Sequence, residues 1–253
     1  MPPSPATLHR PSWPYSEAMA AGLTDSVVSL TDLHFALRVL IRNERHGLHA
    51  YHPHLLQRHS LWHPDALHKL AGQINERSWQ PHPAWAGMRL KGRFATRPLI
   101  SLHGPEELMV YAHLAARLRD AVSPKRRAWY GHYLFGNVPT GAGEVALIDP
   151  YLPHMLALND HLSRRVRRRP VILSLDISGF YEHVQHRVLL DIVRRERLLG
   201  PLDTWLLEET LASFASRFNP GTNLPQGLPQ SYPALSAIPA EAYLIPPTST
   251  TPR

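Results

Sequence analysis

Apolar residues recur at three- and four-residue intervals along much of the chain, and this spacing predicts several helices. The pattern is clearest over residues 105–122, where Pro105 suits a first turn and Glu106 and Glu107 favour the positive end of the helix dipole. We expect this helix to end near Val122, just before Pro124. The same spacing predicts further helices over residues 30–46, 66–77, 150–168, 186–199, 202–218 and 235–244.

Three other stretches carry strand or turn signals. Residues 88–102 alternate between apolar and polar side chains, which predicts a strand pair or a hairpin arm. Residues 171–177 form an apolar run directly after Pro170, and this run predicts a buried strand with Asp176 near its C-terminal end. Several glycines over residues 129–145 predict strand and turn. Helices and strands in this order predict an α+β fold class.

Composition and charge favour a polyanionic partner, most simply a nucleic acid. The 253-residue chain has a net charge of +7, and most of its positive charge is arginine. Guanidinium groups pair with phosphate oxygens and stack on bases. The densest basic run precedes the 171–177 stretch and consists of Arg164, Arg165, Arg167, Arg168 and Arg169. This run is either a contact to a nucleic-acid backbone or a solvated helix end that the dipole favours.

The residue inventory also excludes several classes of site. The chain has no cysteine, so disulfides and thiolate metal centres are excluded. The 17 histidines show no spacing typical of a zinc site. The N-terminus has no signal-peptide pattern and no apolar run reaches the length of a membrane span. We therefore expect a cytoplasmic protein with no membrane partner.

The motif that carries most chemical information begins at Asp176. It reads Asp-Ile-Ser-Gly-Phe-Tyr-Glu-His-Val-Gln-His-Arg-Val-Leu, and it is followed downstream by Leu-Pro-Gln-Gly ending at Gly227. Taken together, the two resemble motifs A and B of reverse transcriptases of the bacterial group II intron, retron and abortive-infection type. Motif A departs from the family pattern only at Val184, where the family has isoleucine. An isolated aspartate at such a position could equally cap a turn.

The resemblance implies a site for nucleotidyl transfer by two divalent metal ions, Mg²⁺ or Mn²⁺. It makes Asp176 the catalytic metal ligand and the carbonyl oxygen of Ile177 a second ligand. It also places Tyr181 at the steric gate, where a ring against the sugar leaves no room for a 2′-hydroxyl and so selects deoxynucleotides. Gln226 and Gly227 would line the nucleotide side of the cleft. The plainer alternative for Tyr181 is ordinary core packing.

A basic segment upstream resembles the part of the fingers in which cations reach the triphosphate. Arg97, which precedes a Pro-Leu pair, matches best, and Lys91 matches the family's lysine, with Arg93 as its substitute. Such cations stabilise the negative charge that develops during phosphoryl transfer. The alternative is a solvated basic hairpin.

By this resemblance the chain divides into four parts. Residues 1–48 are an N-terminal extension with one helix, residues 49–170 are a fingers-like region, residues 171–245 are a partial palm with motifs A and B, and residues 246–253 are a disordered tail. The implied fold is the right-hand polymerase arrangement of fingers and palm, incomplete in this chain. The implied partners are an RNA template, a DNA primer and deoxynucleoside triphosphates, with the oligomeric state left open.

The family's second carboxylate motif, Tyr-x-Asp-Asp, does not occur in this sequence. No aspartate follows Asp203, and the only acidic residue after Gln226 is Glu241. One carboxylate cannot hold two metal ions in transfer geometry, so we expect a truncated and inactive reverse transcriptase. Two alternatives are a catalytically silent nucleic-acid-binding module derived from a polymerase, and a different phosphotransferase that draws a second carboxylate from Asp149 or Asp191.

Overall fold

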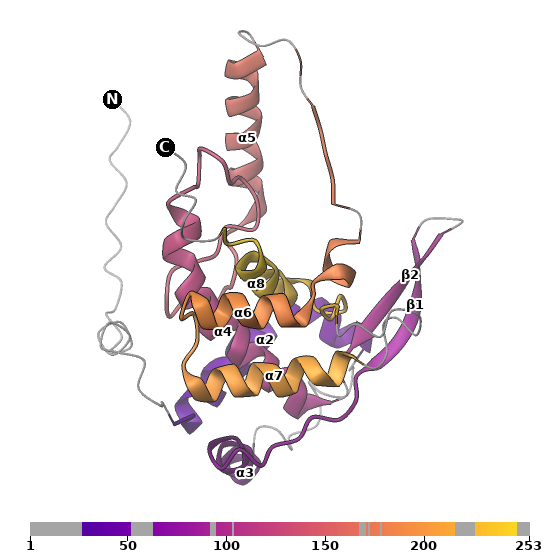
Figure 1. Ribbon diagram of the computed structural model, residues 1–253, viewed down its shortest axis with the longest axis vertical. Helices are drawn as coiled ribbons and strands as arrows, with labels where there is room; N and C mark the ends of the chain where they lie inside the picture. The colour runs from indigo at the N-terminus through magenta and orange to yellow at the C-terminus, as the bar shows by residue number, and fades with distance from the viewer. Residues whose placement is uncertain are drawn as a thin grey trace.

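The computed structural model describes residues 27–51, 63–91, 95–102, 104–166, 171, 173–177, 179–215 and 226–246. Over these residues the fold is α+β, dominated by helices and completed by one two-stranded antiparallel sheet (Figure 1). The helices are α2 (Leu30–Tyr51), α3 (Pro64–Asn75), α4 (Pro105–Arg127), α5 (Tyr151–Val166), α6 (His186–Arg195), α7 (Pro201–Ala215) and α8 (Pro233–Tyr243). The strands are β1 (Trp85–Lys91) and β2 (Ala95–Ser101), and a 3₁₀ turn, η2, covers Phe180–His183.

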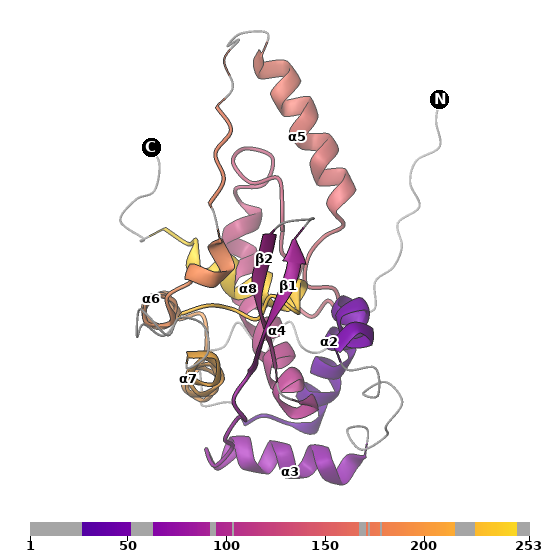
Figure 2. The same ribbon diagram turned by 90° about the vertical axis from the view of Figure 1, so that its right-hand side faces the viewer.

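Helix α4 lies at the centre of the fold, with α2, α7 and α8 packed around it and α6 beside α7 and α8 (Figures 1 and 2). Nearly every residue from Glu107 to Arg119 is buried, on all sides of the helix. A helix in this position needs apolar residues around its whole circumference rather than along one stripe. The run Leu-Met-Val-Tyr-Ala-His-Leu-Ala-Ala in α4 meets that need.

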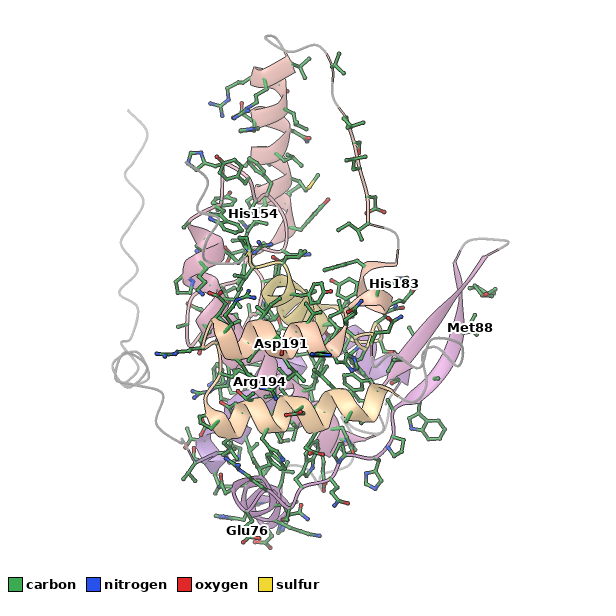
Figure 3. All side chains as sticks on the ribbon, in the orientation of Figure 1. Glu76, Met88, His154, His183, Asp191 and Arg194 are labelled. Carbon is green, nitrogen blue, oxygen red and sulfur yellow. The ribbon has the colours of Figure 1, made fainter. Side chains whose placement is uncertain are left out.

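The predicted hairpin is confirmed, although it begins earlier than residue 88. Strands β1 and β2 pair antiparallel from Trp85 opposite Ser101 to Lys91 opposite Ala95. The hairpin extends away from the helices, and Met88 lies on its outer part (Figure 3). Its inner end joins the core through Ile100. Towards the other end, the described apolar side chains of Met88 and Leu90 are exposed.

Polar side chains of the core fix the loop between α4 and α5. The fully buried guanidinium of Arg119 donates to the hydroxyl of Thr140 and to the carbonyl of Ala146, at 3.1 Å each. From α2, the side-chain oxygen of Asn43 accepts the backbone N–H of Leu147 at 2.9 Å. Because a buried charge without partners is very costly, Arg119 specifies the path of this loop.

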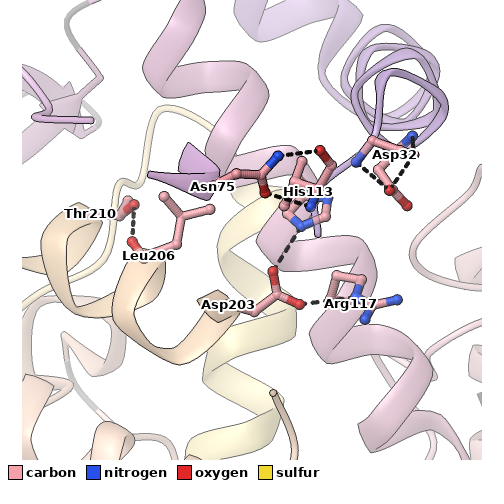
Figure 4. Close-up of polar contacts among 9 residues, drawn as sticks. Asp32, Asn75, His113, Arg117, Asp203, Leu206 and Thr210 are labelled. Atoms are coloured by element: carbon pink, nitrogen blue, oxygen red, sulfur yellow. Dashed lines mark hydrogen bonds and ion pairs between the residues drawn. The ribbon is translucent and has the colours of Figure 1, made fainter. Parts of the chain in front are cut away.

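A second buried network joins α4 to α7 (Figure 4). The Nε2 atom of His113 lies 3.0 Å from one carboxylate oxygen of Asp203, and Arg117 donates to the other at 3.0 Å. Burial alone raises the pKa of Asp203, but the charges and hydrogen bonds of His113 and Arg117 outweigh it and lower the pKa below its usual value. Asp203 therefore stays ionised and ties the two helices together.

Four predicted elements differ from the structure. The 171–177 stretch forms no strand within the described chain, and its described apolar side chains are exposed rather than buried. Helix α4 does not end at Val122, because Pro124 is exposed near the last turn and Lys125 beyond it is held by Glu196 at 2.6 Å. Helix α6 ends at Arg195, two residues before Arg197 adopts a left-handed conformation with φ 50°. Residues 129–145 form turns and isolated bridges.

The carboxylate of Glu44, on helix α2, is buried against the start of α8. Glu44 sits at a kink in α2, where its φ of −118° and ψ of 20° depart from helical values. Its Oε1 atom accepts the backbone N–H of Leu235 at 2.8 Å. Burial raises the pKa of Glu44 to about 7, although hydrogen bonds from the backbone of Leu235 and Ala234 lower it in part.

This raised pKa predicts a loss of stability as the pH rises. The folded protein holds the Glu44 proton more tightly than the unfolded chain, so ionisation costs free energy between pH 4.5 and about 7, reaching about 3 kcal/mol. We expect Glu44→Gln to be more stable than the wild type above pH 7, and we expect the gap between their free energies of unfolding to close towards pH 4.5. Urea unfolding of both proteins across this pH range measures the gap. Glu76→Gln, at an exposed carboxylate (Figure 3), is the control, and a gap independent of pH contradicts the prediction.

Candidate functional site

The sequence motif that starts at Asp176 folds as an extended segment followed by a tight turn. Gly179 begins the turn with φ 62° and ψ 31°, a left-handed conformation that glycine adopts without strain. A Cβ atom there would lie 3.0 Å from both the Glu182 carboxylate and the His183 ring. The turn closes when the Glu182 N–H donates to the Gly179 carbonyl at 2.9 Å. The glycine of the motif is therefore required by backbone geometry and close packing.

The two sequence motifs meet through their backbones. The N–H of Gly227 donates to the carbonyl of Val184, and the N–H of Leu228 donates to the carbonyl of Tyr181, both at 2.9 Å. Gln185 and Gln226 form an antiparallel bridge between the two segments. The structure thus brings residues 181–185 and 226–228 together, although about forty residues separate them in the sequence.

His186 stabilises this junction through a hydrogen bond. It is the first residue of α6, is buried, and its Nε2 atom lies 2.7 Å from the carbonyl oxygen of Gly227. A carbonyl only accepts hydrogen bonds, so Nε2 carries the proton and donates it. Burial lowers the pKa of His186 below its usual value, which keeps the ring neutral, and the ring makes a T-shaped contact with that of Phe214. His186 is therefore a structural residue of the junction.

The ring of Tyr181 belongs to the turn and packs against the hydrophobic core. It is half-buried, and its centroid is 5.8 Å from that of Phe180, which in turn is 6.2 Å from Tyr243. Burial, and then the negative charge of Glu241, raise the pKa of the Tyr181 phenol. The hydroxyl therefore stays protonated at neutral pH, as an uncharged group at the surface of the junction.

Asp176 and Ile177 lie on the exposed segment just before the turn, and both are exposed. Across the described part of the chain, no group of three or more histidine, aspartate or glutamate side chains is arranged to hold a metal ion. Asp149 forms an ion pair with Arg127 at 2.9 Å, and Asp191 lies on the exposed face of α6 (Figure 3). The described residues therefore bring no second carboxylate into a metal-binding group with Asp176, which does not fit a centre for two metal ions.

The remaining predicted site residues are dispersed. Arg97 lies opposite Arg89 in the hairpin, and Lys91 is the last residue of β1, but the placement of their side chains is outside what the structure describes. Arg164 and Arg165 are exposed in the last turn of α5, with Arg164 paired to Asp160. Arg167 and Arg168 lie outside the described residues, as do all of residues 52–62. Their roles stay predictions.

Gln226 is buried, with a relative exposure of 6%, so its side chain reaches no open surface in this structure. Two further side-chain pairs stabilise the elements around the junction. Gln230 donates to Glu182 at 2.9 Å, and a buried ion pair joins Arg126 of α4 to Glu241 of α8. Nothing local in the sequence signals either pair, because each joins residues far apart in the chain.

Comparisons with protein families, with curated proteins and with solved structures find no match to this chain. None of the described helices combines the length and the apolar character that crossing a membrane requires.

The His186 contact predicts a specific loss of stability. His186→Ala removes the donor to a buried carbonyl, and we expect a fall of about 2 kcal/mol in the free energy of unfolding. Because the folded pKa of this histidine is lowered, its stabilising contribution is present above the unfolded pKa of 6.5 and is lost as the pH falls below it. Urea unfolding at pH 7.5 and 5.5 measures both effects. His34→Ala, on the exposed face of α2, is the control, and equal losses in the two variants contradict the prediction.

Proposed function

We propose that this chain is part of a reverse-transcriptase-like nucleotidyltransferase, and that it contributes the surface on which a nucleotide and a primer–template are held. The observation that carries the proposal is the backbone pairing of residues 181–185 with residues 226–228. If the two segments correspond to motifs A and B of reverse transcriptases, they face the same nucleotide. Their direct contact supports the proposal, because motifs A and B must lie side by side to face one nucleotide.

Tyr181 supports a role in sugar selection within this proposal. Its ring is braced by Phe180 on one side and the phenol is uncharged, so it can present a flat apolar surface to a sugar. A rigid ring excludes a 2′-hydroxyl by steric contact more effectively than a mobile side chain would. Gly227 adopts φ 101°, a conformation that brings backbone close to Val184 and Tyr181 without a side chain between them.

The metal requirement limits what the described residues can do. A divalent cation would polarise the triphosphate and activate the attacking hydroxyl, but no group of three or more histidine, aspartate or glutamate side chains among the described residues is arranged to hold one. The proposal is therefore one of binding rather than turnover by this chain as it stands. We expect no primer extension, and incorporation of deoxynucleotides that Asp176→Ala abolishes would show that the chain is an active polymerase.

The Tyr181 proposal predicts a preference between sugars. We expect the wild-type protein to bind dATP in the presence of Mn²⁺ more tightly than ATP, and Tyr181→Ala to reduce that preference about tenfold, which is about 1.4 kcal/mol. Tyr181→Phe is the matched control and should keep the preference, because the ring rather than the hydroxyl excludes the 2′-oxygen. Isothermal titration with each nucleotide measures the affinities. Equal preference in the wild type and Tyr181→Ala would count against the assignment.

A second candidate, a catalytically silent nucleic-acid-binding module, is favoured by the exposed arginines at the end of α5. Simultaneous Arg164→Ala and Arg165→Ala should weaken binding of an RNA–DNA primer–template and reduce the salt slope of log K by about 2, since each lost phosphate contact removes about one unit. Filter binding across a salt series measures the slope. Arg194→Ala with Arg195→Ala is the matched control, because it removes two arginines from the last turn of a different helix, α6. An unchanged slope in the α5 variant excludes that contact.

A further inference from the structure

The segment of residues 171–177 leaves its apolar side chains uncovered. Val171 is 85% exposed, Leu173 79%, Leu175 84% and Ile177 63%. Its described residues are extended, and no backbone hydrogen bond joins them to another described residue. Figures 1 and 2 show the segment running apart from α5 and from the helices around α4. An uncovered extended chain of this kind is a template for pairing with another strand.

The sequence of the segment is complementary to itself when two copies run antiparallel. With Ser174 opposite Ser174, Leu173 lies opposite Leu175 and Val171 lies opposite Ile177. Side chains alternate between the two faces of a strand, so these four residues of each copy fall on one face of the pair. Every odd position from 171 to 177 then has an aliphatic neighbour across the pair.

We propose that a second copy of this chain pairs with residues 171–177, antiparallel and two-fold symmetric about Ser174. The proposal uses only the backbone and side chains of this segment and does not rest on the proposed nucleotide site. A symmetric antiparallel pair also forms a closed dimer rather than an open filament.

The charges at the two ends of the segment decide its orientation. The N-terminal flank is basic, with Arg164 and Arg165 exposed at the end of α5 and further arginines at 167–169 in the sequence. The C-terminal end is acidic, with Asp176 and, in the following turn, Glu182. Antiparallel pairing sets the basic flank of each copy beside the acidic end of the other, whereas parallel pairing sets like charges together.

The contact is small, so the dimer should be weak and concentration-dependent. Stable complexes bury roughly 1,200–2,000 Å², and a pair of seven-residue strands falls below that range. Disulfide trapping suits such a contact, because the chain has no cysteine of its own. A single introduced cysteine therefore reports on one position only.

The test is a set of cysteine variants at exposed positions, oxidised under mild conditions and run on a non-reducing gel. Ser174→Cys should form a covalent dimer by itself, since opposed residues of an antiparallel pair come close enough for a disulfide. Val171→Cys and Ile177→Cys should not dimerise alone, but a mixture of the two should yield the mixed dimer. Efficient self-linking of Val171→Cys would instead show a parallel arrangement and overturn the proposal.

A second measurement separates pairing from chance collision. Light scattering across a concentration series should show the wild type passing from monomer to dimer, and Leu173→Lys with Leu175→Lys should remain monomeric with an unchanged circular dichroism spectrum. Leu90→Lys, at an exposed apolar position on β1, is the matched control and should dimerise like the wild type. A wild-type protein that is monomeric at every concentration, or a dimer that survives the double substitution, overturns the proposal.

Discussion

The fold depends on a buried helix, α4, whose polar side chains bind partners from several different parts of the chain. On α4, Glu107 accepts from His82, His113 meets Asp203, Arg119 holds the loop towards α5 and Arg126 pairs with Glu241. Removing one member of such a buried pair leaves an uncompensated polar group, at a cost of about 3–5 kcal/mol for a charge. Apolar packing alone would tolerate many arrangements around α4, and these contacts select one of them.

The position of the junction between the two motifs depends on these contacts. The Arg126–Glu241 pair holds α8 against α4, and Glu241 is also the charge that helps to raise the pKa of Tyr181. At the other end of α8, Glu44 accepts from the start of the helix while Tyr111 of α4 contacts Ser236 at 3.2 Å. Buried contacts thus set both ends of the helix that follows the Gln226 bend. The geometry of the junction is a property of the core rather than of the loop alone.

The sequence predicted local features well and distant pairings poorly. The start of α4 and the hairpin follow from Pro105, the two glutamates and the alternation of residues near 88–102, all of which act within a few residues. The partners of Arg119 and Glu44 could not be predicted. A buried polar side chain requires a hydrogen-bond partner, but the local sequence does not show which residue supplies it. His186 belongs to the first motif, but its hydrogen bond to Gly227, 41 residues further along the chain, could not be predicted from the local sequence either.

The 171–177 stretch shows why an apolar run is an incomplete signal. Alternating aliphatic residues indicate that one face of a segment needs to be buried. Whether the segment forms a strand depends on a second backbone beside it, and among the described residues no backbone lies beside 171–177. The same stretch carries Asp176, whose carboxylate would lie among the side chains opposite residue 172 if two copies paired about Ser174. Pairing would bring this carboxylate towards the basic flank of the other copy, which stabilises its charge, and a bound cation would stabilise the same charge. Binding of a divalent cation at Asp176 and pairing with a second strand would therefore be linked, because each changes the free energy of the other through the Asp176 carboxylate.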